Sequence, residues 1–169
     1  MTETNPLPSP TFMTWRLAEL AQQQSQTQTA TVIVTSDTVA GKEFGSHAAI
    51  WLDNGPDGPA LYDPGGSYHQ DTRGTGGVLT QQDDHASLQD YIKYQESSGS
   101  KVSTVNIKIS AKDEATIYQH ASDNGERRGL HCAADVSRAV SGVGPFKNVK
   151  EVFLPGTLLK EARSIAASQ

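Results

Sequence analysis

The sequence predicts an α+β fold, in which an antiparallel sheet packs against helices. Short runs of β-branched and apolar residues, typical of strands, are mixed along the chain with runs of helix formers. The two kinds of segment do not follow the strict strand–helix alternation that builds a parallel sheet. A segment rich in Asp, Asn, Gly and Pro joins two of the predicted strands, which indicates a hairpin and antiparallel pairing.

The N-terminal part predicts a flexible leader with a short helix over residues 1–28, followed by one catalytic domain over 29–169. Residues 1–11 are rich in Pro, Thr and Ser, a composition typical of disorder. Residues 14–24 are helix formers with a short apolar stripe, Trp15, Leu17, Leu20 and Ala21. The β-branched run 29–36 predicts a buried strand.

The next segment predicts a hairpin. After a turn-prone stretch over 37–46, strands are expected over 47–52 and 60–63, joined by DNGPDGP. His47 and Asp63 would then lie on adjacent antiparallel strands, near the end away from the turn. Residues 64–84 are glycine-rich and predict a long loop, either a lid over a site or an irregular connection.

The second half predicts four more helices and at least one strand. We expect an amphipathic helix over 87–95, a strand over 101–109 and a helix over 110–121 with Ser110 as N-cap. A loop over 123–129 leads to a helix over 132–140, ended by Gly142. A short strand or turn around 152–154 precedes a C-terminal helix from Pro155 or Gly156.

Composition excludes several functional classes. The net charge is −5 over 169 residues and no basic run occurs, which argues against nucleic-acid binding. One cysteine cannot form an intrachain disulfide or a cysteine-rich zinc site, and we predict no cofactor or metal. No apolar stretch approaches the ~20 residues that cross a bilayer. The N-terminus lacks the features of a Sec signal, so we expect synthesis in the cytoplasm and export, if any, by another machinery.

The single cysteine, Cys132, stands where a loop turns into a helix. Unpaired N–H groups and the positive end of the helix dipole favour the thiolate there, and the thiolate is the nucleophilic form. A structural cysteine would more often lie in the middle of the apolar stripe. We therefore interpret Cys132 as a functional thiol, with a buried apolar cysteine as the alternative.

A thiol nucleophile requires an imidazole base, itself oriented by a third polar group. Among five histidines, His47 opens an apolar strand, whereas His85 and His120 suit solvated positions and His131 adjoins the cysteine. Asp63 would end the neighbouring strand and can accept from the imidazole. His69 and Asp71, in the glycine-rich loop, are alternative orienting residues.

These features resemble a known group of enzymes. A strand that begins with His, a hairpin to a polar residue and a later Cys at a helix start resemble the circularly permuted papain-like fold. This group includes permuted NlpC-type peptidases and relatives of lecithin retinol acyltransferase. The strings GSHAAIWL, ALYDPGGSY, RGTGGV, LQDYIKYQ, HCAADVSRAVSGVGPF and LPGTL are similar to a domain of bacterial polymorphic toxins and type VI secretion effectors. The resemblance covers about residues 45–160.

The resemblance implies roles for three residues: Cys132 as nucleophile, His47 as general base and then acid, and Asp63 as orienting residue. It implies a secreted antibacterial amidase or peptidase that acts on peptidoglycan peptide or a target-cell protein. The partners it implies are a cognate immunity protein and a secretion machinery or carrier protein. The alternatives are a lipid acyltransferase or phospholipase, and a non-enzymatic binding domain. The acyltransferase relatives often carry Asn before the Cys, where this chain has His131.

Overall fold

The computed structural model describes residues 10–24, 26–69, 77–125, 127 and 130–169, and these form an α+β fold. In this part of the chain five strands build one antiparallel sheet, in the order β4-β3-β2-β1-β5. The strands are β1 (Thr27–Val39), β2 (Lys42–Gly55), β3 (Gly58–Tyr62), β4 (Val78–Thr80) and β5 (Lys101–Ser110). The predicted α+β class is confirmed.

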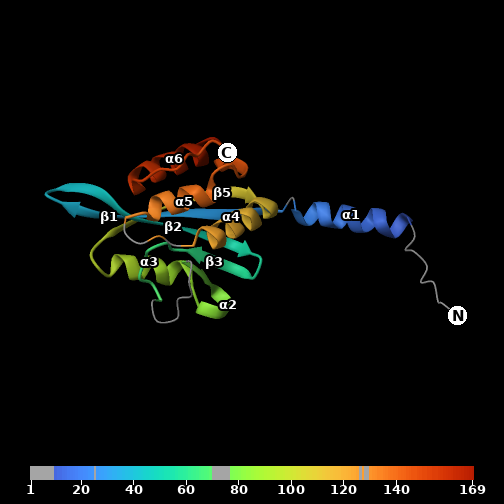
Figure 1. Cartoon of the computed structure of the whole chain (residues 1–169), viewed down its shortest axis with the longest axis horizontal. Coiled ribbons are helices and arrows are strands. Elements are labelled where there is room, and N and C mark those ends of the chain that lie inside the picture. Colours follow the sequence, from blue (N-terminus) through green and yellow to red (C-terminus); the bar gives the residue numbers. More distant parts are fainter. Residues whose placement is uncertain (1–9, 25, 70–76, 126, 128–129) are drawn as a thin grey trace.

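Helices cover both faces of the sheet (Figure 1). On one face lie α4 (Ala111–Asn124), α5 (Cys132–Val140) and α6 (Pro155–Ala167), with a short 3-10 turn at Gly144–Phe146. On the other face lie α2 (Gln81–Asp84) and α3 (Leu88–Glu96). The helix α1 (Pro10–Gln24) projects away from this body (Figure 1). Among the described residues, no helix combines the length and apolar character that a membrane crossing requires.

Side chains alternate along β2 between two apolar clusters, because successive residues of a strand point to opposite faces. Ala48, Ile50 and Leu52 belong to the cluster under α4, α5 and α6. Ala49 and Trp51 belong to the cluster on the side of α3. The central part of β2 is therefore buried on both faces, and each face contributes side chains to a different apolar cluster.

The predicted helix starts at Ser87 and Ser110 are confirmed by their caps. The hydroxyl of Ser87 accepts from the backbone N–H of Asp90, and Ser110 forms a capping box with Asp113. A capping box satisfies two backbone donors that the first helical turn leaves unpaired. The helix α4 runs to Asn124, so the predicted loop over 123–129 begins two residues too early.

The turn predicted over 37–46 is wrong in extent. The strands β1 and β2 continue through this stretch, and the turn itself is Ala40 and Gly41, both with positive φ. Gly41 accepts that conformation without strain, so two residues suffice to reverse the chain. Polar side chains along 37–46 suggested a loop because this part of the hairpin is exposed on both faces.

Two further expectations are corrected, one for the stretch 64–84 and one for a strand at 152–154. The stretch 64–84 is not one loop, since β4 pairs with β3 and α2 follows it; residues 70–76 lie outside the described part. No strand forms at 152–154, where the N–H of Val152 instead donates to Ser137 Oγ. On α1 the residues Trp15 and Leu17 of the predicted stripe are 61% and 66% exposed, while Leu20 borders a hollow against α4.

Candidate active site

Cys132 is the first residue of α5, as predicted, and that helix is almost entirely enclosed. Every residue of α5 except Arg138 is buried, and Cys132 itself is 8% exposed. The run CAADVSRAV carries small side chains that let the helix approach the sheet closely. The apolar cluster under α5 includes Cys132, so the sulfur sits at the border of the core.

His47 lies on β2 at a β-bulge. The register of β2 against β1 shifts here, since His47 pairs with Thr35 while Gly45 pairs with Ser36. Ser46 is therefore an extra residue, and its hydroxyl donates to the carbonyl of Thr35 at 3.3 Å. A bulge redirects neighbouring side chains and bends the strand. The His47 ring keeps 17% of its surface exposed, so it borders solvent.

Asp63 follows the last residue of β3 and is completely buried. Its Oδ1 lies 2.6 Å from His47 Nε2, which confirms the predicted proximity of the two residues. Its backbone N–H donates to the carbonyl of Gly77, and the N–H of Gly66 donates to its carbonyl. A side chain at Gly66 would overlap the Asp63 carboxylate, so glycine is required for this close turn.

Tyr91 also contacts the carboxylate, and the sequence pattern did not reveal it. Its hydroxyl donates to Asp63 Oδ1 at 2.8 Å, the same oxygen that His47 approaches. Tyr91 is fully buried on α3, where its spacing from Leu88 marked it only as part of an apolar face. A buried tyrosine hydroxyl requires a polar partner, and that requirement is the signal that could have singled it out.

The candidate site residues lie on both faces of the sheet. Cys132 packs on the side of α5, whereas Asp63 contacts Tyr91 of α3 on the opposite side. The last residue pair between β2 and β3 is Ile50 with Tyr62, so β3 does not accompany β2 as far as His47. The imidazole occupies the end of the shortened sheet, where both faces are within its reach.

The electrostatics of His47 favour the charged imidazolium. Burial lowers its pKa, but the hydrogen bond and the charge of Asp63, together with the Cys132 side chain, outweigh burial and raise the pKa to about 9. The Oδ1 contact occupies Nε2, so Nδ1 is the ring nitrogen left for the thiol.

The thiol shows the complementary shift. Burial raises the pKa of Cys132. The hydrogen bond and positive charge of His47, together with the backbone N–H groups of Ala48 and Ala133, lower the pKa by more than burial raises it. The net pKa of Cys132 lies below its ordinary value. A thiolate beside an imidazolium is the protonation state that a thiol nucleophile requires.

An ion-pair network holds the start of α5 in place. Asp135, 1% exposed, accepts from Arg127 Nε at 2.6 Å and from Arg138 at 3.5 Å. Both arginines also reach Glu151, Arg138 at 2.8 Å and Arg127 at 3.4 Å. The network therefore joins the segments before and after α5, and a buried carboxylate with these partners fixes them relative to each other.

The other predicted candidates differ in their exposure and contacts. The His69 ring lies against that of Tyr68 at an angle of 41°, with ring centroids 4.1 Å apart, and Asp71 lies outside the described residues. His85 is exposed, as predicted. His120 is half-buried and its Nδ1 contacts the carbonyl of Ala139 at 3.0 Å, so its assignment as a solvated residue is wrong. His131 caps α5, and its Nδ1 is buried without a hydrogen-bond partner in the described part of the chain.

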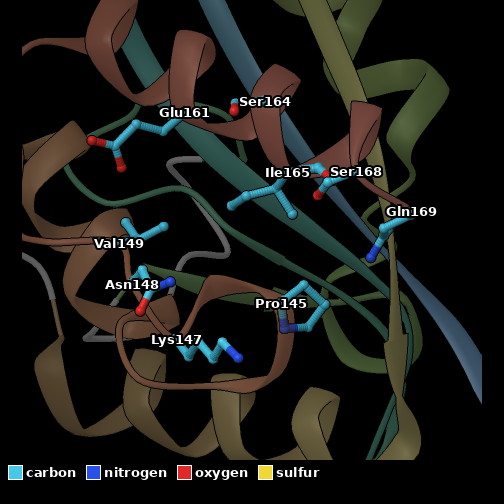
Figure 2. Close-up of a pocket in the computed structure, with 9 residues that line it drawn as sticks. All are labelled: Pro145, Lys147, Asn148, Val149, Glu161, Ser164, Ile165, Ser168 and Gln169. Carbon is cyan, nitrogen blue, oxygen red and sulfur yellow. The ribbon is translucent and has the colours of Figure 1, made fainter.

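A hollow of about 570 Å³ lies between α6 and the segment after α5 (Figure 2). Glu161 and Lys147 border it from opposite sides, and its lining includes no histidine or cysteine. None of Cys132, His47 and Asp63 lines it. Nucleophile and base lie together only at the start of α5, so the candidate site is assigned by chemistry and not by the size of a hollow.

The assembled groups can support attack of a thiolate on a carbonyl carbon, followed by proton transfer from the imidazole. The side chains come from β2, from the end of β3, and from α3 and α5, so they depend on the whole fold. No family model, curated protein or solved structure matches this chain.

Proposed function

We propose that this chain is a cysteine hydrolase that cleaves amide bonds, with Cys132 as nucleophile, His47 as general base and acid, and Asp63 as orienting residue. The observation that carries the proposal is the 2.6 Å contact of His47 with the buried Asp63 carboxylate, with the Cys132 thiol at the start of α5 close enough to His47 for each to shift the pKa of the other. The opposite pKa shifts of the thiol and the imidazole support an ion pair ready to react.

In the proposed reaction, the Cys132 thiolate attacks the amide carbonyl and forms a tetrahedral intermediate. The C–N bond breaks as His47 gives its proton to the leaving amine, and a thioester remains on Cys132. His47, now neutral, takes a proton from water as the water attacks the thioester. Release of the carboxylic acid restores the thiolate and the imidazolium. Asp63 keeps the ring oriented in both steps.

We propose that the fold is papain-like and circularly permuted, since the residue that supplies the base precedes the nucleophile in the chain. The support is the antiparallel sheet with His47 on one of its strands and the helix that Cys132 begins. The proposed biological role is a secreted antibacterial effector, delivered into a target cell and neutralised by an immunity protein. That role rests on the resemblance of the toxin-like strings.

The test compares the wild-type chain with Cys132→Ala and His47→Ala. We expect wild type to release new fragments from purified sacculi or from target-cell proteins, detected by mass spectrometry, and both variants to lose this activity at least about 1,000-fold. Ser98→Ala, at an exposed residue in the turn after α3, serves as the control. Variants that retain wild-type activity would overturn the assignment.

A lipid acyl substrate is the second candidate, and one observation favours it. Leu130, two residues before Cys132, is 87% exposed, and Phe153 and Leu154 are 61% and 68% exposed. Exposed large apolar side chains near a reactive group can dock on a lipid surface. Release of fatty acid from phospholipid vesicles by wild type, with unchanged muropeptides and proteins, would favour this candidate over amide hydrolysis.

A further inference from the structure

Tyr91 and His47 meet at a single oxygen atom. Asp63 Oδ1 lies 2.8 Å from the Tyr91 hydroxyl and 2.6 Å from His47 Nε2. A tyrosine hydroxyl donates one proton, and a carboxylate oxygen accepts two hydrogen bonds. Tyr91 and Asp63 are both 0% exposed, so water does not compete for this oxygen. In such a dry environment, hydrogen bonds to one atom strongly influence each other.

We propose that Tyr91 is a positioning residue for the pair formed by Cys132 and His47, and that it acts by holding Asp63 Oδ1 and sharing this oxygen with the imidazole. The inference rests on the proposed function, because it assigns Tyr91 a part in the same site. Tyr91 fixes the carboxylate from the side of α3, while the turn at Gly66 encloses it from the other side.

The hydrogen bond from Tyr91 to the shared oxygen weakens the electrostatic stabilisation that Asp63 gives to the His47 imidazolium. The phenol hydrogen bond draws negative charge from Oδ1, which reduces the stabilisation that the carboxylate gives to the imidazolium. A more weakly held proton on His47 is easier to transfer to a leaving group. Without the phenol, Asp63 Oδ1 would carry more negative charge toward His47 Nε2, and His47 would become a weaker acid.

The groups that face this set come from four elements. His47 belongs to β2, Cys132 to α5 and Tyr91 to α3, and Asp63 follows β3. Tyr68, next to Tyr91 with ring centroids 5.2 Å apart, also senses the charge of Asp63. Burial makes the largest contribution to raising the pKa of Tyr68, and the charges of Asp90 and Asp63 raise the pKa further. Tyr68 therefore remains neutral at the pH values of interest.

The single cysteine provides a direct readout. Iodoacetamide can alkylate only one thiol in the chain, so its rate constant against pH reports the thiolate of Cys132 and its imidazolium partner. The wild-type profile should show two transitions, the upper one from loss of the His47 proton. In Tyr91→Phe we expect the upper transition to move to higher pH, because His47 should bind its proton roughly three- to tenfold more tightly. This factor corresponds to the net contribution of one hydrogen bond.

Tyr94→Phe is the matched control, because Tyr94 lies on the same helix and its hydroxyl contacts Ser67 at 2.6 Å instead of Asp63. Its profile should superimpose on that of wild type. Should Tyr91→Phe fail to fold, as judged by circular dichroism, 3-fluorotyrosine introduced at position 91 replaces it. This more acidic phenol donates more strongly, so the upper transition should move to lower pH.

A wild-type profile with two transitions that neither Tyr91→Phe nor the fluorinated chain shifts would overturn the role of Tyr91 alone. A wild-type profile with the single transition of a free thiol would overturn the pair itself, and the proposed function with it. The alkylation measurement requires no substrate. If sacculi and proteins are not cleaved, a shifted profile in Tyr91→Phe would still support the positioning role of Tyr91.

Discussion

At the residue scale, the site depends on small side chains as much as on reactive ones. Cys132, His47 and Asp63 could be identified from the sequence because their residue types and their places at element ends point to one chemistry. Tyr91 could not, since an amphipathic helix pattern does not distinguish a packed tyrosine from one whose hydroxyl serves a buried carboxylate. Gly66 was part of a turn signal, and its role against Asp63 follows only from tertiary contact.

Gly66→Ala tests the fit around the carboxylate. The new methyl group would overlap Asp63, so either the turn or the carboxylate must move. We expect a loss of stability of about 1–3 kcal/mol, typical of overpacking, and a lower pKa of His47 as Asp63 withdraws. Urea unfolding and NMR titration of the His47 ring measure the two effects. An unchanged His47 titration in a folded variant would show that the carboxylate has kept its place.

At the scale of elements, sequence patterns predicted the helices better than the strands. The start of α5 at Cys132, the capped starts of α3 and α4, and Pro155 as the first residue of α6 agree with expectation. Caps and prolines mark helix starts locally. The strands β1 and β2 extend well beyond their apolar parts, and β4 has only three residues. Their pairing partners define them, and pairing over long sequence separation leaves little local signal.

Gly45→Ala tests the contact between β2 and α6. A Cβ at Gly45 would lie 2.7 Å from the Gly156 nitrogen and 3.0 Å from the Pro155 Cβ, so α6 must shift away from the strand. We expect a loss of about 1–3 kcal/mol in the free energy of unfolding, measured with urea.

The control for this prediction lies across the same contact. Gly156→Ala places a methyl group in open space within the first turn of α6, and no atom outside its own helix lies within 4 Å of it. We expect a neutral effect or a gain of up to about 1 kcal/mol, since alanine favours a helix over glycine. Equal losses from both substitutions would contradict the close-contact explanation for Gly45.

At the scale of the whole molecule, stability should fall with pH in two separate ranges. Glu114 is 1% exposed; burial, reinforced by the charge of Asp53, outweighs the hydrogen bond from the Asn54 N–H and raises its pKa from 4.5 to about 7. His47 is raised from 6.5 to about 9. In both cases the folded state binds the proton more tightly. Stability is therefore highest below the ordinary pKa and is lost as pH rises through the folded-state value.

Glu114→Gln should remove the lower of these two ranges. The amide can still accept from the Asn54 N–H but carries no charge, so we expect the variant to exceed wild type by about 3 kcal/mol at pH 8 and to match it near pH 4.5. Urea unfolding from pH 4 to 10 measures both, with Glu19→Gln on the exposed α1 as control. A loss of stability between pH 4.5 and 7 that persists in Glu114→Gln would exclude Glu114 as its source.

The early end of β3 also determines what an incoming substrate meets. Asp63 carries its negative charge on the α3 side of the sheet and without solvent exposure, while Cys132 lies on the α5 side. The thiol and the carboxylate therefore approach His47 from opposite faces of the sheet, and the imidazole lies between these two anionic groups. In the proposed ion-paired state one imidazolium lies between two anions, the thiolate and the carboxylate, so the site stays net negative and should favour neutral or cationic groups near the thiol over anionic ones.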